Sequence, residues 1–137
     1  MEVIKITLGF VGGLLFIGWP AMQVYHSWMV GWPIARLFEK RQMIVFGRKP
    51  SQRYKFGGLI NLAIAVAAVW AFLEFGSKTL IYASIAGGLL ILTVAILRTR
   101  DATIETHEEI YSDLNGMGQT VVKDDMKKYG VDVSKWN

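Results

Sequence analysis

The sequence has 137 residues, enough for one compact unit, and 53% of them are hydrophobic while 19% are charged. It contains no cysteine, which excludes disulfide bonds, thiolate catalysis, cysteine zinc sites and iron–sulfur ligation. The formal net charge is +4, but the basic residues flank apolar runs, so we expect lipid headgroups rather than nucleic acid as their partner.

Charged residues are strongly segregated along the chain. Between Phe56 and Leu97 only Glu74 and Lys78 are charged, whereas fourteen charged residues follow between Arg98 and Asn137. A soluble fold distributes charge over all of its helices, so this pattern indicates an integral membrane protein. We expect an all-α, multi-pass chain with a membrane domain over residues 1–97 and a polar cytoplasmic tail over residues 98–137.

The first apolar region, residues 6–37, contains the tripeptide Gly-Trp-Pro twice, starting at Gly18 and at Gly31. Proline is favoured in the first turn of a helix and disrupts a helix interior, so each tripeptide is interpreted as a helix boundary. This predicts a first span over residues 3–19, then an interfacial and basic segment over 20–55 that includes an amphipathic helix from Pro33 to Phe46. The alternative is one long kinked helix that runs to Leu37.

The second and third spans are the clearest. Residues 56–75 carry no charge before Glu74, and residues 79–97 carry none. At about 1.5 Å per residue, each run covers roughly the 30 Å hydrocarbon core of a bilayer. The connection between them is so short that it predicts an antiparallel hairpin.

Basic residues predict the orientation of the chain. The positive-inside rule predicts that the basic segment and the C-terminus lie in the cytoplasm and that the N-terminus lies outside. The membrane is expected to be the cell (inner) membrane. The same side chains are expected to contact anionic lipid headgroups, although the simpler interpretation is that they only orient the chain. They are Arg36, Lys40, Arg41, Arg48, Lys49, Arg53 and Lys55.

Small residues at helical spacings predict faces on which helices pack closely in lipid. They are Gly9 and Gly13 in the first span, Ala63, Ala67 and Ala71 in the second, and Ala83, Gly87 and Gly88 in the third. The tail is expected to form two short helices, over residues 101–114 and 120–129. Its apolar content is too low for an independent core, so it should dock on a partner, dock on residues 36–55, or be partly mobile.

One helix face near the membrane carries groups that could bind a metal. Met22, His26 and Met29 fall at positions i, i+4 and i+7, and thioether and imidazole groups suit copper. The interpretation we favour is an interfacial histidine with methionines that fill packing gaps, and we expect no metal and no cofactor. The carboxylates around His107 are out of register for a metal site on a helix.

No motif typical of catalysis is present: the sequence lacks a phosphate-binding loop, a zinc-protease motif and a nucleophile elbow. Ion-coupled transport needs ionisable groups at membrane depth, whereas the polar side chains well inside the last two spans are Asn61, Ser84 and Thr93.

The leading hypothesis is therefore a non-catalytic accessory or assembly subunit that binds other membrane-protein subunits in a larger complex. An energy-transducing, oxidase or oxygenase assembly is a guess from architecture alone. The alternatives are a self-associating small pore or transporter, and a copper- or cofactor-binding membrane protein.

Overall fold

Long uncharged apolar runs fold as helices in lipid because a helix satisfies its own backbone hydrogen bonds. The computed structural model, which describes residues 2–134 and 136, has three helices long and apolar enough to cross a membrane. They are Glu2–Lys40, Pro50–Phe75 and Lys78–Leu97. The prediction of an all-helical chain with three such helices is confirmed, and it indicates an integral membrane protein.

The first of these helices is continuous, so the predicted boundaries at the two Gly-Trp-Pro sites are wrong and the long-helix alternative is closer. Three α-helical parts, α1 (Glu2–Gly12), α2 (Trp19–Tyr25) and α3 (Trp32–Lys40), are joined by π-helical turns. These turns are η1 (Gly13–Gly18) and η2 (His26–Gly31). The predicted interfacial segment after residue 19 is thus part of the same helix, and the helix ends at Lys40 instead of continuing to residue 46.

The π turns explain how the helix continues through its prolines. A proline ring clashes with the carbonyl four residues earlier and removes one backbone hydrogen bond. For Pro20 and Pro33 that carbonyl belongs to Phe16 and Met29, which lie inside η1 and η2. A π turn accommodates an extra residue in the helix, which makes room for the ring without ending the helix.

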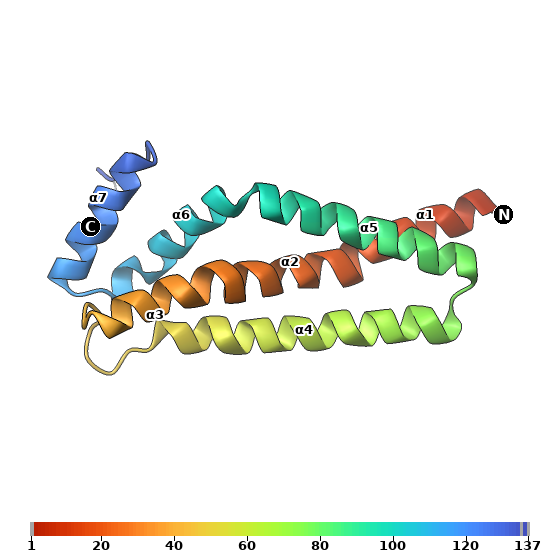
Figure 1. Cartoon of the computed structure of the whole chain (residues 1–137), viewed down its shortest axis with the longest axis horizontal. Helices are drawn as coiled ribbons and strands as arrows, with labels where there is room; N and C mark the ends of the chain where they lie inside the picture. Colours follow the sequence, from red (N-terminus) through yellow and green to blue (C-terminus); the bar gives the residue numbers. More distant parts are fainter. Residues whose placement is uncertain (1, 135, 137) are drawn as a thin grey trace.

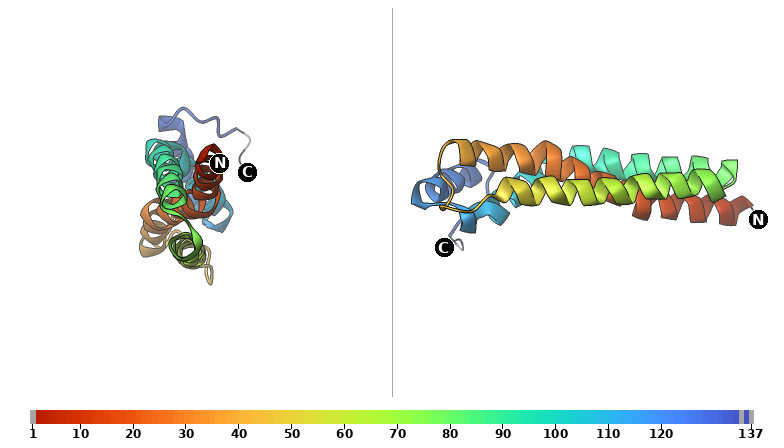
Figure 2. Two further views of the ribbon diagram at one scale, coloured as in Figure 1. Left: turned by 90° about the vertical axis from the view of Figure 1, so that its right-hand side faces the viewer. Right: turned by 90° about the horizontal axis from the view of Figure 1, so that it is seen from below.

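The long helix lies between the other two membrane helices (Figure 1). Helix α4 (Pro50–Phe75) packs along α2, η2 and α3, while α5 (Lys78–Leu97) packs along α1 and η1. Figure 2 shows the three helices running along the same long axis. Although α4 and α5 run in opposite directions, they share little direct contact, so the predicted hairpin is not a closely packed pair.

The end of the molecule farthest from the N-terminus has a core of its own. Helix α3 and the start of α4 meet α6 (Thr99–Ile110), η3 (Tyr111–Asp113) and α7 (Gly116–Lys128), as Figure 1 shows. We call this part the head. Its buried core consists of Ala35, Phe38, Met43, Tyr54, Ile110, Tyr111, Leu114, Val122 and Met126.

Of the three arrangements expected for the tail, the structure shows the second: the tail docks on residues 36–55. Ile110, Leu114, Val122 and Met126 of the tail are almost completely buried. Burying a side chain of this size contributes about 1.5–3 kcal/mol. The tail is too poor in apolar residues to build a core alone, but it completes one together with α3 and the start of α4.

Candidate functional site

Close contact between the long helix and α5 depends on small residues from both. A Cβ atom on Gly9 would lie 2.7 Å from the Leu80 carbonyl oxygen, and one on Gly13 would overlap the backbone of Ser84. From the other side, a Cβ on Gly87 would overlap the Phe10 carbonyl. The predicted packing residues in this interface are Gly9, Gly13, Ala83, Gly87 and Gly88.

The alanines predicted to form a packing face on α4 lie elsewhere. Ala63 and Ala67 are exposed, whereas the buried small residues of α4 are Gly58 and Ala65. Gly58 lies directly under the indole of Trp28.

Ala67, Ala68 and Ala71 of α4 line an open apolar groove of about 570 Å³, which lies between α4, η1 and the start of α5. We call it the α4 groove. Its lining residues are Phe16, Ile64, Ala67, Ala68, Ala71, Phe72, Phe75, Gly76 and Leu80.

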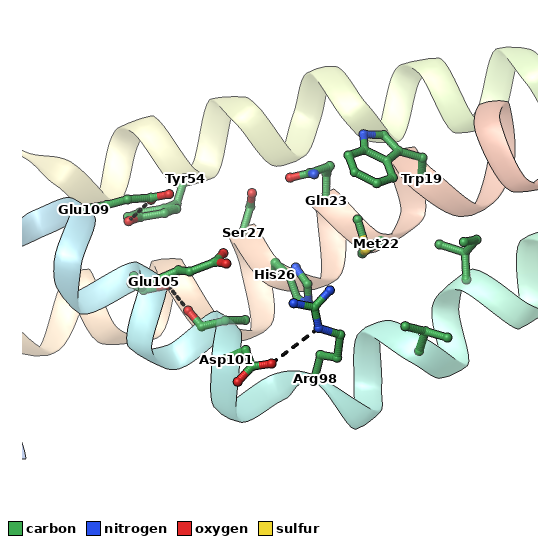
Figure 3. Close-up of a pocket in the computed structure, with 14 residues that line it drawn as sticks. Trp19, Met22, Gln23, His26, Ser27, Tyr54, Arg98, Asp101, Glu105 and Glu109 are labelled. Carbon is green, nitrogen blue, oxygen red and sulfur yellow. Dashed lines mark hydrogen bonds and ion pairs between the residues drawn. The ribbon is translucent and has the colours of Figure 1, made fainter. Parts of the chain in front are cut away.

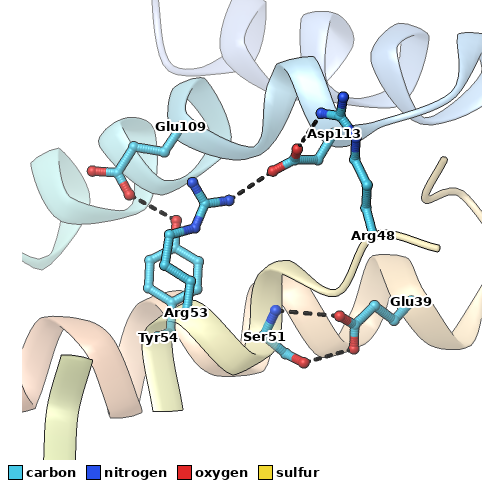
Figure 4. Close-up of polar contacts among 7 residues, drawn as sticks. All are labelled: Glu39, Arg48, Ser51, Arg53, Tyr54, Glu109 and Asp113. Carbon is cyan, nitrogen blue, oxygen red and sulfur yellow. Dashed lines mark hydrogen bonds and ion pairs between the residues drawn. The ribbon is translucent and has the colours of Figure 1, made fainter. Parts of the chain in front are cut away.

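One carboxylate of the tail binds two arginines of the basic segment (Figure 4). Asp113, whose side chain is 13% exposed, pairs with Arg48 at 2.7 Å and with Arg53 at 2.6 Å. Its backbone carbonyl accepts a hydrogen bond from the Val45 N–H at 2.9 Å. Because one mostly buried carboxylate binds two guanidinium groups, it joins the tail, the loop before α4 and α4 itself.

Two further polar contacts support the same region. The Tyr54 hydroxyl donates to the Glu109 carboxylate at 2.8 Å. The Glu39 carboxylate accepts hydrogen bonds from the hydroxyl and the backbone N–H of Ser51, which satisfies a free donor in the first turn of α4 (Figure 4). These bonds connect α3, α4 and α6 in addition to the apolar core.

The residues predicted to contact lipid headgroups therefore fall into two groups. Arg48 and Arg53 are bound to Asp113, although about half of each side chain remains exposed. The other five are exposed around the head: Arg36, Lys40, Arg41, Lys49 and Lys55. Headgroup contact by these side chains stays a prediction.

A cavity of about 430 Å³ lies between the long helix and the junction of α5 with α6 (Figure 3). The helical path breaks at Arg98, where φ is −100° and ψ is 22°, and α6 leaves the membrane helices there in a new direction. One side of the cavity is apolar and lies within the apolar helices. Its residues are Trp19, Met22, Ile91 and Val94.

The opposite side of the cavity is acidic. Asp101, Glu105 and Glu109 follow one another at a spacing of four residues, so they share one face of α6. Asp101 pairs loosely with Arg98 at 3.4 Å, and Glu109 is bound to Tyr54. The Glu105 carboxylate points across the cavity toward the long helix, and no residue in the described part of the chain hydrogen-bonds to it (Figure 3).

The structure places two of the three candidate metal ligands beside one cavity and the third outside it. His26 and Met22 line the cavity, and His26 Nε2 lies 3.4 Å from the Ala95 carbonyl oxygen. Met29 is 67% exposed and lies outside the cavity lining, because the π turn that begins at His26 breaks the i, i+4, i+7 relation. Within the described residues, no three His, Asp or Glu side chains are arranged to hold a metal ion.

Sequence reasoning missed the acidic face of the cavity because it compared the carboxylates only with His107. That histidine is buried in the head, where its Nδ1 lies 2.8 Å from the Thr103 carbonyl oxygen and its ring meets Phe38 edge-on. The spacing of Asp101, Glu105 and Glu109 was a usable signal. The residues that face these carboxylates are His26 and its neighbours. They could not be predicted, because they reach the cavity only if the long helix is continuous.

The three polar side chains expected well inside the last two spans bind their own helix. Asn61 Nδ2, Ser84 Oγ and Thr93 Oγ1 each donate to a backbone carbonyl three or four residues earlier, at 2.7–2.9 Å. Each of these donors therefore has a partner without reaching another helix.

Comparison with known proteins adds no relative: no protein-family model matches the chain, and no curated protein or solved structure is detectably similar to it. Three features of the structure bear on function: the α4 groove, the head and the cavity at the α5–α6 junction.

Proposed function

We propose that the chain is a non-catalytic accessory or assembly subunit of a larger membrane protein complex. The observation that carries this proposal is the α4 groove. Exposed apolar side chains alone are expected of any lipid-facing helix, but Ala67 and Ala71 are one helical turn apart and line a groove between large side chains. Small residues in this arrangement let the backbone of a second helix approach closely, so a helix of another subunit is the proposed occupant.

The head supports the same proposal. It presents a folded, charged surface, and its tail helices are attached to α3 and to the start of α4 through Asp113 and the core around Ile110. In this proposal the chain lies in the cell (inner) membrane. The head is in the cytoplasm and the N-terminus is on the outer side, because the basic residues concentrate at the head. A partner could thus be bound both within the membrane and at its cytoplasmic surface.

The alternative of a self-associating pore or transporter has less support. A conducting path needs polar or ionisable side chains directed at a shared channel. Asn61, Ser84 and Thr93 instead bind backbone carbonyls of their own helices. The copper-binding alternative has less support as well, since Met29 lies outside the cavity that holds Met22 and His26.

Filling the α4 groove should release the partner. We expect the wild-type chain, extracted from its native membrane in mild detergent, to elute in a complex well above its own mass of 15.4 kDa. Ala67→Leu should reduce the fraction in that complex about tenfold, because overpacking an interface costs about 1–3 kcal/mol. Size-exclusion chromatography with light scattering and mass spectrometry of the complex measures both.

Ala86→Leu is the matched control, because Ala86 is also an exposed alanine but lies on α5 outside the groove. It should leave the complex intact. A wild-type chain that elutes alone at 15.4 kDa would contradict the proposal. A complex that contains only copies of this chain would favour the pore, which a flux assay in liposomes then tests.

A further inference from the structure

We infer that the cavity at the α5–α6 junction binds the headgroup of an aminophospholipid, a lipid that carries a primary ammonium beside its phosphate. The inference goes beyond the proposed function and does not depend on it. Three properties of the cavity support it: the charge of its lining, the loosely paired guanidinium of Arg98, and its position at the end of the membrane helices.

The charge of the lining favours a cation. Three carboxylates, those of Asp101, Glu105 and Glu109, face the cavity against one guanidinium, that of Arg98. A primary ammonium has three N–H donors and no acceptor. Glu105 is the carboxylate without a partner among the described residues, so it is the first acceptor for the ammonium (Figure 3). Oxygens of Gln23 and Ser27 on the opposite wall complete the set.

Arg98 supplies the complement for the phosphate. Its pair with Asp101 is long, at 3.4 Å, and both side chains are more than half exposed. An exposed pair of this kind is weak, so the guanidinium can turn to another anion at little cost. A guanidinium binds phosphate oxygens through two parallel hydrogen bonds. The cavity edge therefore matches a zwitterion, with its anion at Arg98 and its cation at Glu105.

The position of the cavity matches the depth of a lipid headgroup. Helix α5 ends at Leu97, so Arg98 and α6 lie just beyond the last apolar turn. On the membrane side, Trp19 and Ile91 offer an apolar surface on which the start of an acyl chain can lie. The volume of about 430 Å³ lies within the range of about 300–1,000 Å³ that is usual for small-molecule sites.

The headgroup chemistry predicts selectivity among lipids. Phosphatidylethanolamine offers both the N–H donors and the phosphate. Phosphatidylcholine offers a quaternary ammonium, which cannot donate a hydrogen bond to Glu105, and phosphatidylglycerol offers no cation. The full chain should therefore retain phosphatidylethanolamine in preference to both when the three lipids have identical acyl chains.

Native mass spectrometry of the full chain in detergent, incubated with an equimolar mixture of these three lipids, tests the inference. Wild type should retain one phosphatidylethanolamine. Glu105→Gln and Arg98→Gln should each lower that retention about tenfold, which corresponds to about 1.4 kcal/mol. Glu108→Gln is the matched control, because Glu108 is an exposed carboxylate of α6 outside the cavity, and it should behave as wild type.

Equal retention of the three lipids by the wild-type chain would overturn the inference, as would a preference for phosphatidylglycerol. The same retention by Glu105→Gln and Glu108→Gln would overturn it too. Free phosphoethanolamine is added as a competitor to distinguish a site for the whole lipid from a site for the headgroup alone. Displacement of the lipid at equal concentration would contradict a lipid site. Far-UV circular dichroism of each variant confirms that its helices are intact.

Discussion

Replacing Gly13 by alanine is expected to lower the free energy of unfolding by about 2–3 kcal/mol, near the top of the range for overpacking. The added Cβ would overlap the backbone of Ser84, so no side-chain rotation can make room. The long helix and α5 would have to separate, and the contacts made by Gly9 and Gly87 would be lost with them. Unfolding in detergent by titration with a denaturing surfactant, followed by circular dichroism, measures the change.

Gly57→Ala is the control for that experiment. Gly57 is also helical, but a Cβ added there would meet nothing within 4 Å. Alanine should be neutral there, or stabilise α4 by about 0.5–1 kcal/mol through its higher helix propensity. Equal unfolding midpoints for the Gly13 and Gly57 variants would contradict the packing of the long helix against α5.

Replacing Asp113 by asparagine is expected to loosen the head. The variant leaves the guanidinium groups of Arg48 and Arg53 without their carboxylate and turns an amide N–H₂ toward one of them. Hydrogen bonds to charged groups contribute about 1.5–3 kcal/mol, and the half-exposed arginines place this cluster toward the lower end. Hydrogen exchange of the amides around Val122 in α7 should accelerate about tenfold.

Asp101→Asn provides the comparison, because Asp101 also pairs with an arginine but is exposed and lies outside the head core. Its effect on exchange in α7 should be smaller than about twofold, as expected of an exposed ion pair. If both variants accelerate exchange equally, the docking of the tail does not depend on the Asp113 cluster.

The membrane helices could be predicted because their signal is local. An uncharged run of the right length has few alternatives in lipid, so residues 56–75 and 79–97 were recognised from length and charge alone. The prediction for the first helix is wrong because proline does not always mark a helix boundary. The helix continues through Pro20 because η1 forms before it. No residue type in the sequence indicates that this π turn forms.

The site was less predictable because it depends on contacts between distant segments. The tail was expected to need a partner, yet nothing in its own sequence showed that Leu114 pairs with Ile44 in the loop after α3. The seven basic residues were treated as one group, although the position of Asp113 separates Arg48 and Arg53 from the rest. The cavity depends on the break in the helical path at Arg98, which lets α6 pack against η2 and α3.

In the topology that we propose, the chain crosses a membrane three times, with the head on one side and the α4–α5 connection on the other. The chain has no cysteine, so a single introduced cysteine reports its own location. In intact cells, a membrane-impermeant maleimide should label Ser77→Cys, should label Ser112→Cys only after permeabilisation, and should leave Ala86→Cys unlabelled in both states. Labelling of the first two positions from the same side, or rapid labelling of the third, would contradict this topology.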